Sequence, residues 1–327
     1  MMTLGSLSPV ALAHRLAHDG LCFQMGRFQV MLRSPIARLA KTLGSLYADY
    51  PLAPTDGFTD FHIDLAPAAG LRRWIRPQVA FDFDGHSPFK PLPVGQAFPL
   101  LEWGLNWCVS SAANTFLIIH AAVIEKDGFA AILPAPPGSG KSTLCAALVN
   151  RGWRLLSDEL TLVGIEDGQI VALPRPVSLK NASIDIMRAY APQAVFSPKV
   201  FDTTKGTIAH MKPPTDSVQR AGESARPAWI IFPRYEAGAA TRMTSIAPAD
   251  AFLRLAENCF NYSALGVHGF EAVARLMDTC CCHEFTYSVL DEAIAAFAAL
   301  RQTPSRQPAL APQFLPQDSP QAAPATP

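Results

Sequence analysis

The stretch Ala135-Pro136-Pro137-Gly138-Ser139-Gly140-Lys141-Ser142-Thr143 decides the fold of this chain. It follows an apolar segment, Phe129–Leu133, and it opens a segment of helical character, Lys141–Asn150. Glycine, four residues and then Gly-Lys-Ser/Thr is the pattern of a loop that wraps nucleotide phosphates. Ala135 stands where the first glycine is usual, and its methyl group requires only an ordinary backbone angle. The sequence therefore predicts a strand, a phosphate-binding loop and a helix.

Each residue type in this loop has a chemical use toward phosphate. Gly138 and Gly140 let the backbone turn its N–H groups inward, and the start of the helix adds partial positive charge. Lys141 is expected to reach the β and γ phosphates, and the Ser142 hydroxyl to bind Mg²⁺. A glycine-rich turn with an exposed lysine is the alternative. Because a strand precedes the loop and a helix follows it, we expect all of Ala135 to Thr143 to bind ATP with Mg²⁺.

The apolar pattern around the loop predicts strands and helices in succession, as in an α/β fold. Strands are expected at Phe116–Glu125, Phe129–Leu133, Arg154–Ser157, Leu160–Ile165, Ile170–Leu173, Ala228–Phe232 and Glu284–Val289. Helices are expected at Lys141–Asn150, Ala249–Asn258, Phe270–Cys280 and Leu290–Leu300. The segment Pro174–Pro214 is polar and gives few periodic stretches. The run Phe129–Leu133 is apolar throughout, which predicts a central strand.

We divide the chain into three parts. Residues 1–97 form a small α+β region of unknown role, with a helix at Ser8–His18 and strands at Phe28–Leu32, Phe58–Leu65 and Val79–Asp84. A proline-rich connector separates it from the α/β domain at residues 98–302. Residues 303–327 carry a proline every few positions, and such a tail cannot bury enough apolar surface to offset the entropy of ordering, so we expect disorder.

The composition of the chain limits the kinds of molecule that it is expected to bind. Hydrophobic residues make up 49% of the chain and charged residues 17%, and the formal net charge is zero. Without a block of Lys and Arg, a general electrostatic grip on nucleic acid or on an anionic membrane is not expected. The most apolar stretch, Phe98 to Ile119, is interrupted by Glu102, Asn106 and Asn114, so it predicts a buried helix and a strand and no membrane span. With no signal peptide recognised at the N-terminus, we expect a cytoplasmic protein.

The seven cysteines include the run Cys280, Cys281 and Cys282. Their odd number and the adjacency of three argue against a disulfide framework. His283 follows the run, which leaves a metal site open, but zinc sites usually combine two spaced pairs of ligands. Thiols buried in the core are the favoured interpretation.

Further residues stand in a fixed order around the loop. His120 lies on the strand before it, and the helix after it ends at Arg151-Gly152 and leads to Asp158-Glu159. This order over Leu117–Val163 resembles HPr kinase/phosphorylase and the HPr-kinase-related proteins, which share a core with phosphoenolpyruvate carboxykinase. The resemblance is closest to the branch called HprK-related kinase A, associated with exosortase-type gene neighbourhoods, which also has stretches like Arg175–Lys180 and Thr204–Thr207. It implies a P-loop kinase core with a mixed sheet at 98–302.

The resemblance also implies roles for individual residues. Asp158 would be the general base, and Glu159, where the family usually has a second Asp, would hold Mg²⁺ with Ser142, directly or through water. His120 would lie near the γ-phosphate, where it could orient Asp158 or stabilise charge, and Lys141 would contact the phosphates. The alternatives are a buried core histidine for His120 and a helix or loop cap for the two carboxylates.

The chain also departs from the family. The signature Glu-Ile-Arg-Gly-Leu-Gly is not found, and Arg175–Lys212 stands in its place. The family's N-terminal domain is not recognisable in residues 1–100, so HPr as partner and the phosphorylase reaction are not carried over. Basic side chains after the loop are candidates for contacts with phosphate or acceptor, since cations stabilise the transferring group, or else ordinary surface charges: Arg175, Lys180, Lys205 and Arg220.

The function expected from these residues is that of an ATP-dependent kinase acting on a hydroxyl, with serine of a protein or peptide as the favoured acceptor. A non-catalytic ATP-binding regulator and a small-molecule or carboxykinase-like enzyme are the alternatives. Relatives in the resembled family assemble as hexamers, which leaves homo-oligomers open for this chain.

Overall fold

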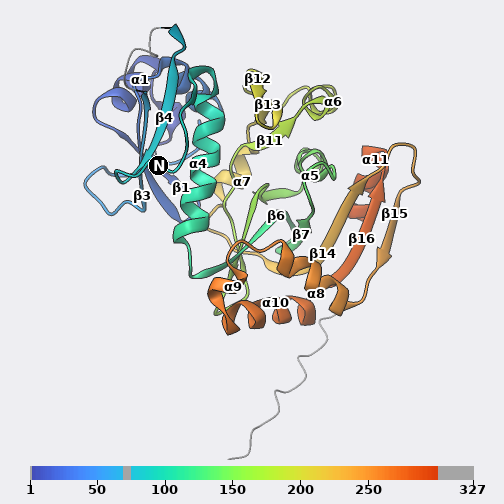
Figure 1. Ribbon diagram of the computed structural model, residues 1–327. Helices are drawn as coiled ribbons and strands as arrows, with labels where there is room; N and C mark the ends of the chain where they lie inside the picture. Colours follow the sequence, from blue (N-terminus) through green and yellow to red (C-terminus); the bar gives the residue numbers. More distant parts are fainter. Residues whose placement is uncertain (1, 69–74, 301–327) are drawn as a thin grey trace, which may run out of the picture.

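Three β-sheets organise the part of the chain that the computed structural model describes, residues 2–68 and 75–300. A five-stranded sheet belongs to the N-terminal region. An eight-stranded sheet is built from strands that precede and follow the loop in the sequence, and a three-stranded sheet connects the two. In Figure 1 the N-terminal region, in blue and cyan, lies on one side of the molecule, and the strands of the eight-stranded sheet lie on the other. The fold is mixed α/β with mixed sheets, as the sequence predicts.

The eight-stranded sheet has the order β10-β9-β6-β7-β14-β16-β15, and β8 also pairs with β6. Its strands are β6 (Phe116–Lys126), β7 (Phe129–Pro134), β8 (Arg154–Ser157), β9 (Leu160–Gly164), β10 (Ile170–Val171), β14 (Arg226–Tyr235), β15 (Arg242–Ser245) and β16 (Cys281–Tyr287). The strands β7, β14 and β16 are parallel to one another, and the other pairs are antiparallel. The carboxyl ends of these three parallel strands therefore meet at one edge of the sheet, which is where open α/β sheets bind ligands.

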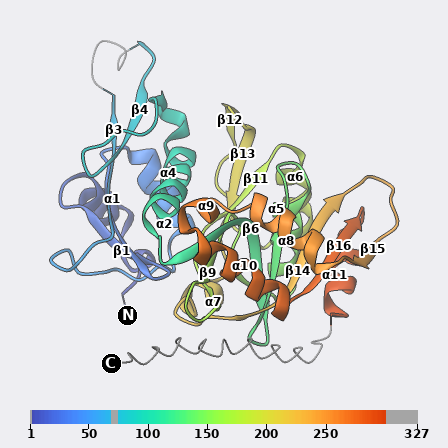
Figure 2. The same ribbon diagram turned by 60° about the horizontal axis from the view of Figure 1, so that its bottom comes forward.

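Helices cover both faces of this sheet. One face packs on α5 (Lys141–Val149) and α11 (Leu290–Ala298), and the other on α8 (Pro248–Glu257), α9 (Tyr262–Leu265) and α10 (Val267–Thr279). Figure 2 brings α8, α9 and α10 to the front, where they lie across the sheet. Along β7, Ala131 and Leu133 join the first of these cores, whereas Ala130 and Ile132 join the second. This strand is apolar throughout because both of its faces are covered, and it is central, as predicted.

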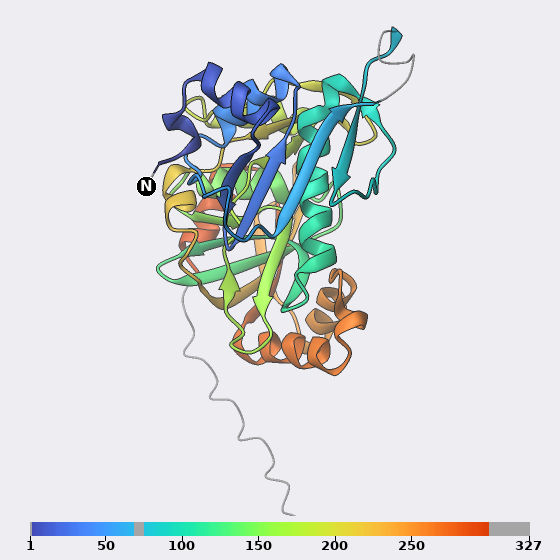
Figure 3. The same cartoon turned by 90° about the vertical axis from the view of Figure 1, so that its left-hand side faces the viewer.

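The N-terminal sheet has the order β1-β2-β3-β4-β5, and Figure 3 views the molecule from its side. Its elements are α1 (Pro9–Ala17), β1 (Leu21–Met25), β2 (Phe28–Arg33), α2 (Ala37–Leu46), β3 (Phe61–Pro67), β4 (Gln78–Phe83) and β5 (Leu92–Pro93), with short 3-10 helices at Leu4–Ser6 and Val94–Gln96. Helix α4 (Ala97–Ala112) packs against it. Gly104 permits this approach, because a side chain there would overlap the ring of Phe81. One continuous core includes this region and also Ile118 and Leu162 of the large sheet.

The third sheet is the largest departure from the predicted elements. The polar segment after Pro174 forms β11 (Val177–Lys180), α6 (Ala182–Tyr190), β12 (Val200–Thr203), β13 (Gly206–Met211) and α7 (Thr215–Gln219). Its strands have four to six residues, which is too short for a clear alternation of apolar and polar positions. The sheet pairs as β11-β13-β12 and places β11 beside the loop helix α5.

Several boundaries also differ. The strand expected at Glu284–Val289 begins at Cys281, so the cysteine run lies on β16. The sequence interpretation omitted β1, α2 and β15. Among the helices that the structure describes, none combines the length and the apolar character needed to cross a bilayer. The tail predicted at 303–327 lies outside the described residues.

A buried polar network ties the N-terminal region to the segment that leads into β11. The Tyr47 hydroxyl donates to Oε1 of Glu102 at 2.6 Å, and Nη1 of Arg175 donates to Oε2 of Glu102 at 3.3 Å. Arg175 also donates to Asn106, and the Tyr50 hydroxyl donates to the carbonyl of Pro174 at 2.7 Å. Burial raises the pKa of Glu102, and the charge of Arg175 opposes this rise. The basic candidate Arg175 is therefore a structural residue paired inside the protein.

Removing one member of this pair should destabilise the fold. Arg175→Met leaves Glu102 buried beside no cation, and we expect a loss of about 3 kcal/mol in the free energy of unfolding at neutral pH. The double variant Glu102→Gln/Arg175→Met should regain most of this loss, because it removes both charges together. Urea denaturation of the wild type, both single variants and the double variant measures the cycle. Additive losses in the double variant would contradict the pairing.

Candidate functional site

The predicted phosphate loop connects β7 to α5 at the carboxyl edge of the parallel strands. Gly138 and Gly140 both have φ +86°, a left-handed conformation that L side chains rarely adopt. The ends of the neighbouring strands hold the loop: the Tyr287 hydroxyl donates to the carbonyl of Gly140 at 3.0 Å, and the N–H of Tyr235 donates to the carbonyl of Ser139 at 2.8 Å. A side chain on Gly140 would meet the Tyr287 hydroxyl. The two glycines of the motif are therefore required by the backbone geometry.

A cavity of about 550 Å³ lies over the loop, a size that suits a small organic ligand. Its lining includes eight of the nine predicted loop residues, Pro136 to Thr143, together with His120, Glu159, Ser178, Lys180, Asn181, Ala182, Ser183, Ile186, Tyr235, Tyr287, Ser288 and Leu290. Two predicted site residues do not line it. Ala135 is buried at the end of β7, and Asp158 is buried at the end of β8.

Two polar atoms of the loop are buried without a partner. Lys141 is only 8% exposed, and its Nζ makes no hydrogen bond to any residue that the structure describes. The hydroxyl oxygen of Ser139 is also buried and has no hydrogen-bond partner among these residues. The carboxyl groups of Asp158 and Glu159 interact with the charge of Lys141, but these buried donors still require a hydrogen-bond acceptor, which a ligand in the cavity would supply. Phosphate oxygens meet this requirement, and the residues present thus fit a nucleotide.

Asp158 and Glu159 follow β8 and face the loop helix with opposite pKa shifts. Burial and the charge of Glu159 raise the pKa of Asp158 above its ordinary value, against the lowering effect of Lys141. Oδ2 of Asp158 accepts a hydrogen bond from the N–H of Ser178 at 3.1 Å. Its Oδ1 has no hydrogen bond of good geometry within the described ranges, although the nearby Ser142 hydroxyl helps to lower the pKa. This oxygen is available to accept a proton.

Glu159 carries the negative charge of the pair. Burial pushes its pKa up, but the hydrogen bond with His120 and the charges of Lys141 and Lys180 outweigh burial, and the pKa is lowered. Nε2 of His120 lies 3.3 Å from Oε2 of Glu159. The suggestion that His120 orients Asp158 is therefore corrected, since its carboxylate partner is Glu159. Two adjacent carboxylates whose pKa values are driven apart are suited to different roles.

Ser142 and Glu159 both line the cavity and could hold Mg²⁺. No three His, Cys, Asp or Glu side chains converge as a metal site in residues 2–68 and 75–300. Mg²⁺ is usually held by one or two carboxylates together with substrate phosphates and water, so two protein ligands suit it. On β16, Cys282 joins the core under α8 and α10, whereas Cys281 packs against the core on the opposite face of the sheet. This alternation separates neighbouring thiols of the run.

The four basic candidates separate into two groups. Lys180 lines the cavity, and Lys205 lies with its Nζ 5.2 Å from the ring centroid of Trp103. Burial lowers the pKa of Lys205, and the charges of Glu159, Lys180 and Lys141 also act on it, so Lys205 lies near the cavity without being part of its lining. Arg220 instead pairs with Glu223 at 2.8 Å, and Arg175 pairs with Glu102. Neither of these two arginines lines the cavity.

Sequence reasoning missed several residues that shape the site. Tyr235 and Tyr287 are the last residues of β14 and β16, the two strands that are parallel to β7. Once the pairing of these strands is known, the position of both tyrosines at the carboxyl edge marks them as residues of the site. Ser178 supplies the N–H that binds Asp158, and the Thr143 hydroxyl donates to that of Ser183 at 2.9 Å. Both serines belong to the segment after Pro174, for which no regular structure was predicted.

The comparisons with known proteins show similarity over part of the chain or at low sequence identity. A family model described as SynChlorMet cassette protein ScmC matches residues 104–246, which include the loop, His120 and Asp158. No curated protein matches the chain. Among solved structures, the HPr(Ser) kinase/phosphatase from Coxiella burnetii is similar at 12% sequence identity and a TM-score of 0.23, over 55% of this chain and 91% of that one. The chain is thus a mixed α/β protein with a low level of similarity to an HPr(Ser) kinase/phosphatase, and the family model that matches it is that of ScmC.

Proposed function

We propose that this chain is a magnesium-dependent ATP phosphotransferase that phosphorylates a hydroxyl, with serine of a protein or peptide as the acceptor. The proposal depends on one observation: the ammonium of Lys141 and Oδ1 of Asp158 are both buried with no hydrogen bond of good geometry among the described residues, and the charge of Lys141 and the Ser142 hydroxyl both act on Asp158. A cation and a carboxylate oxygen with unused hydrogen-bonding capacity, close together beside the loop, match the phosphate-binding and proton-accepting groups of a phosphoryl transfer. A module that only binds nucleotide has no use for the second group.

The residues then have separate tasks. Bound magnesium ATP supplies an electrophilic γ-phosphoryl group with ADP as its leaving group. Lys141 neutralises phosphate oxygens, and Ser142 and Glu159 hold the metal. Asp158 takes the proton of the acceptor hydroxyl while the new bond from oxygen to phosphorus forms and the bond to the ADP oxygen breaks. His120 keeps Glu159 ionised, since its hydrogen bond lowers the pKa of that carboxyl group.

A trapping experiment tests the proposal. Full-length Asp158→Asn, immobilised with magnesium ATP, should retain an acceptor that the wild type releases after transfer, because the variant keeps Lys141 and lacks the base. Captured proteins are identified by mass spectrometry and then incubated with wild type and γ-³²P-ATP, and phosphoserine is located by peptide mapping. Label on a serine of a captured protein is the expected result. Tight ATP binding without transfer to any captured hydroxyl would instead indicate an ATP-binding regulator, and transfer to a small molecule alone would indicate a metabolite kinase.

A further inference from the structure

A second cavity lies at the opposite edge of the large sheet, where the three parallel strands begin. It has a volume of about 500 Å³, similar to that of the cavity over the loop. Phe129 begins β7 and pairs in register with Arg226, the first residue of β14, while Trp229 pairs with Cys281, the first residue of β16. The turn at residues 167–169 and helix α10 complete the lining.

The two cavities are separate. They share no lining residue. From Phe129 to the end of β7 the strand advances about 3.3 Å per residue, so the phosphate loop lies roughly 17 Å away on the far edge. The function proposed for the loop therefore makes no use of this second cavity.

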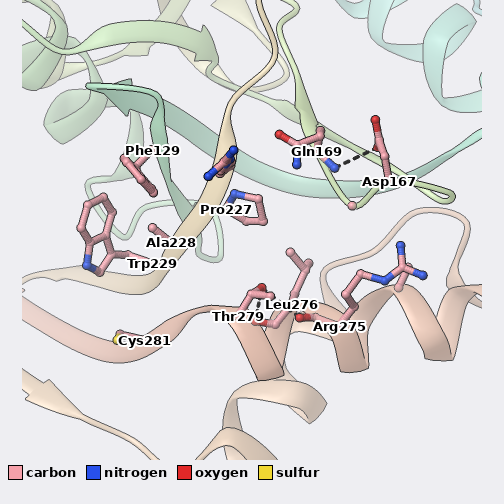
Figure 4. Close-up of a pocket in the computed structure, with 13 residues that line it drawn as sticks. Phe129, Asp167, Gln169, Pro227, Ala228, Trp229, Arg275, Leu276, Thr279 and Cys281 are labelled. Atoms are coloured by element: carbon pink, nitrogen blue, oxygen red, sulfur yellow. Dashed lines mark hydrogen bonds between the residues drawn. The ribbon is translucent and has the colours of Figure 1, made fainter. Parts of the chain in front are cut away.

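One end of the second cavity is apolar and the other is cationic. Figure 4 shows Phe129 and Trp229 at one end, and Arg275 with Asp167 at the other. Pro227, Ala228 and Leu276 lie between the two ends. Trp229 is buried in the protein body, so it forms a firm wall at the apolar end. A cavity with this gradient suits a ligand that has an apolar body and a charged head.

The charge of the polar end is positive. Nη1 of Arg275 donates to the carbonyls of Ile165 and Glu166, each at 3.0 Å, which fixes the guanidinium against the β9–β10 turn. Arg226 and Arg275 are exposed, and neither the other N–H groups of Arg275 nor the guanidinium of Arg226 have a hydrogen-bond or ion-pair partner in the described part of the chain. These two arginines and one carboxylate, Asp167, line the cavity, and Asp167 already accepts from the N–H of Gln169 at 3.0 Å.

The acidic residue nearest to Arg226 in sequence is paired with other arginines. Glu223, three residues before Arg226, lies 2.8 Å from Nη2 of Arg220 and 3.7 Å from Nη1 of Arg154. Arginine presents several N–H donors in a fixed fork, which matches the oxygens of a carboxylate or a phosphate. The donors of these two exposed arginines that have no protein partner are therefore open to an anion from solution.

We propose that this cavity is a second ligand site, which binds a small organic anion with an aromatic body and one carboxylate or phosphate head. The head binds to Arg226 and Arg275, and the body packs against Phe129 and Trp229. Both kinds of anion share the chemistry that the arginines recognise, so the experiment uses one probe of each kind. The proposal is independent of the reaction at the loop.

Binding to the full-length protein tests the site. Phenyl phosphate and 3-phenylpropionate are titrated by isothermal calorimetry, with 3-phenylpropanol and inorganic phosphate as probes that lack the head or the body. We expect at least one aromatic anion to bind, and Arg226→Gln to weaken it about tenfold, the change for one lost charge-assisted hydrogen bond. Arg226 is suited to this test because it is exposed and its side chain makes no hydrogen bond or ion pair with the described residues. Arg27→Gln, in the exposed β1–β2 turn, is the matched control and should change nothing.

Magnesium ATP distinguishes the two cavities. At a saturating concentration of magnesium ATP, binding of the aromatic anion should remain measurable. The loss of affinity caused by Arg226→Gln should also be unchanged, because the two cavities share no lining residue. Three results would overturn the proposal: no heat from either aromatic anion up to roughly 10 mM, equal affinity in Arg226→Gln and Arg27→Gln, or full displacement by ATP. A preference for phenyl phosphate over 3-phenylpropionate, or the reverse, would identify the head group.

Discussion

Asparagine in place of Asp158 is expected to slow phosphoryl transfer by about 10³-fold, within the range that a positioned general base contributes. The amide keeps the shape of the carboxylate and can still accept from the N–H of Ser178, so the local backbone has no reason to move. It cannot take the proton of the acceptor hydroxyl. Affinity for magnesium ATP should stay close to that of the wild type, because the phosphate contacts come from Lys141 and the loop.

The same variant should be more stable than the wild type at neutral pH. Burial raises the pKa of Asp158 to about 6. The folded state therefore binds this proton more tightly than the unfolded chain does, and the stability it contributes is present at low pH and lost as the pH rises through 6. At pH 7.5 the wild type carries a buried carboxylate at a cost of about 3 kcal/mol, and Asp158→Asn removes it. Below about pH 4 the two proteins should have equal stability.

Denaturation and kinetics at several pH values measure both effects. Urea unfolding between pH 4 and pH 8 follows the difference in stability, and the pH profile of kcat/KM for the wild type should rise through about 6 with the ionisation of free Asp158. Glu159→Gln is the contrasting control: the pKa of Glu159 is lowered, so its stabilising charge is present above its ordinary pKa, and this variant should be less stable at pH 7.5. Unchanged transfer in Asp158→Asn would exclude Asp158 as the base. Reduced stability of that variant at pH 7.5 would show that Asp158 is a structural charge.

The parts of the site that local sequence determines were the ones that could be predicted. The loop needs glycines with positive φ and a helix that starts at Lys141, and both requirements lie within nine consecutive residues. Tyr235 and Tyr287 close the same loop, but their place depends on β14 and β16 pairing in parallel with strands distant in sequence. Apolar periodicity identifies such strands without giving their order in a sheet.

Two other differences between the predicted and the observed site also arise from contacts between parts of the chain that are distant in sequence. Arg175 looked like a ligand for phosphate, because its partner Glu102 lies on a helix that precedes it by 73 residues. A sequence shows that a charge exists, and only the fold shows whether it is paired. The strands after Pro174 are four to six residues long and partly polar because they form a small sheet of their own. Their contribution to the site, the N–H of Ser178, is a backbone group that no residue pattern marks.

Methionine in place of Lys141 is expected to abolish measurable binding of magnesium ATP without unfolding the protein. Lys141 is 8% exposed and its ammonium has no hydrogen-bond partner in the described residues, but its charge acts on Asp158 and Glu159. Methionine fills the space with an unbranched side chain of similar length and removes this charge, so the apo melting temperature should fall moderately while the fold is retained. In the wild type, ATP at about 100 times its Kd should stabilise the fold by about 2.7 kcal/mol. Lys141→Met should lose this increment, and Lys90→Met, at an exposed position in the N-terminal region, should keep it. Differential scanning fluorimetry with and without magnesium ATP measures both variants. If the increment survived in Lys141→Met, the phosphates would not lie against this ammonium, and the chemistry assigned to the loop would have to be withdrawn.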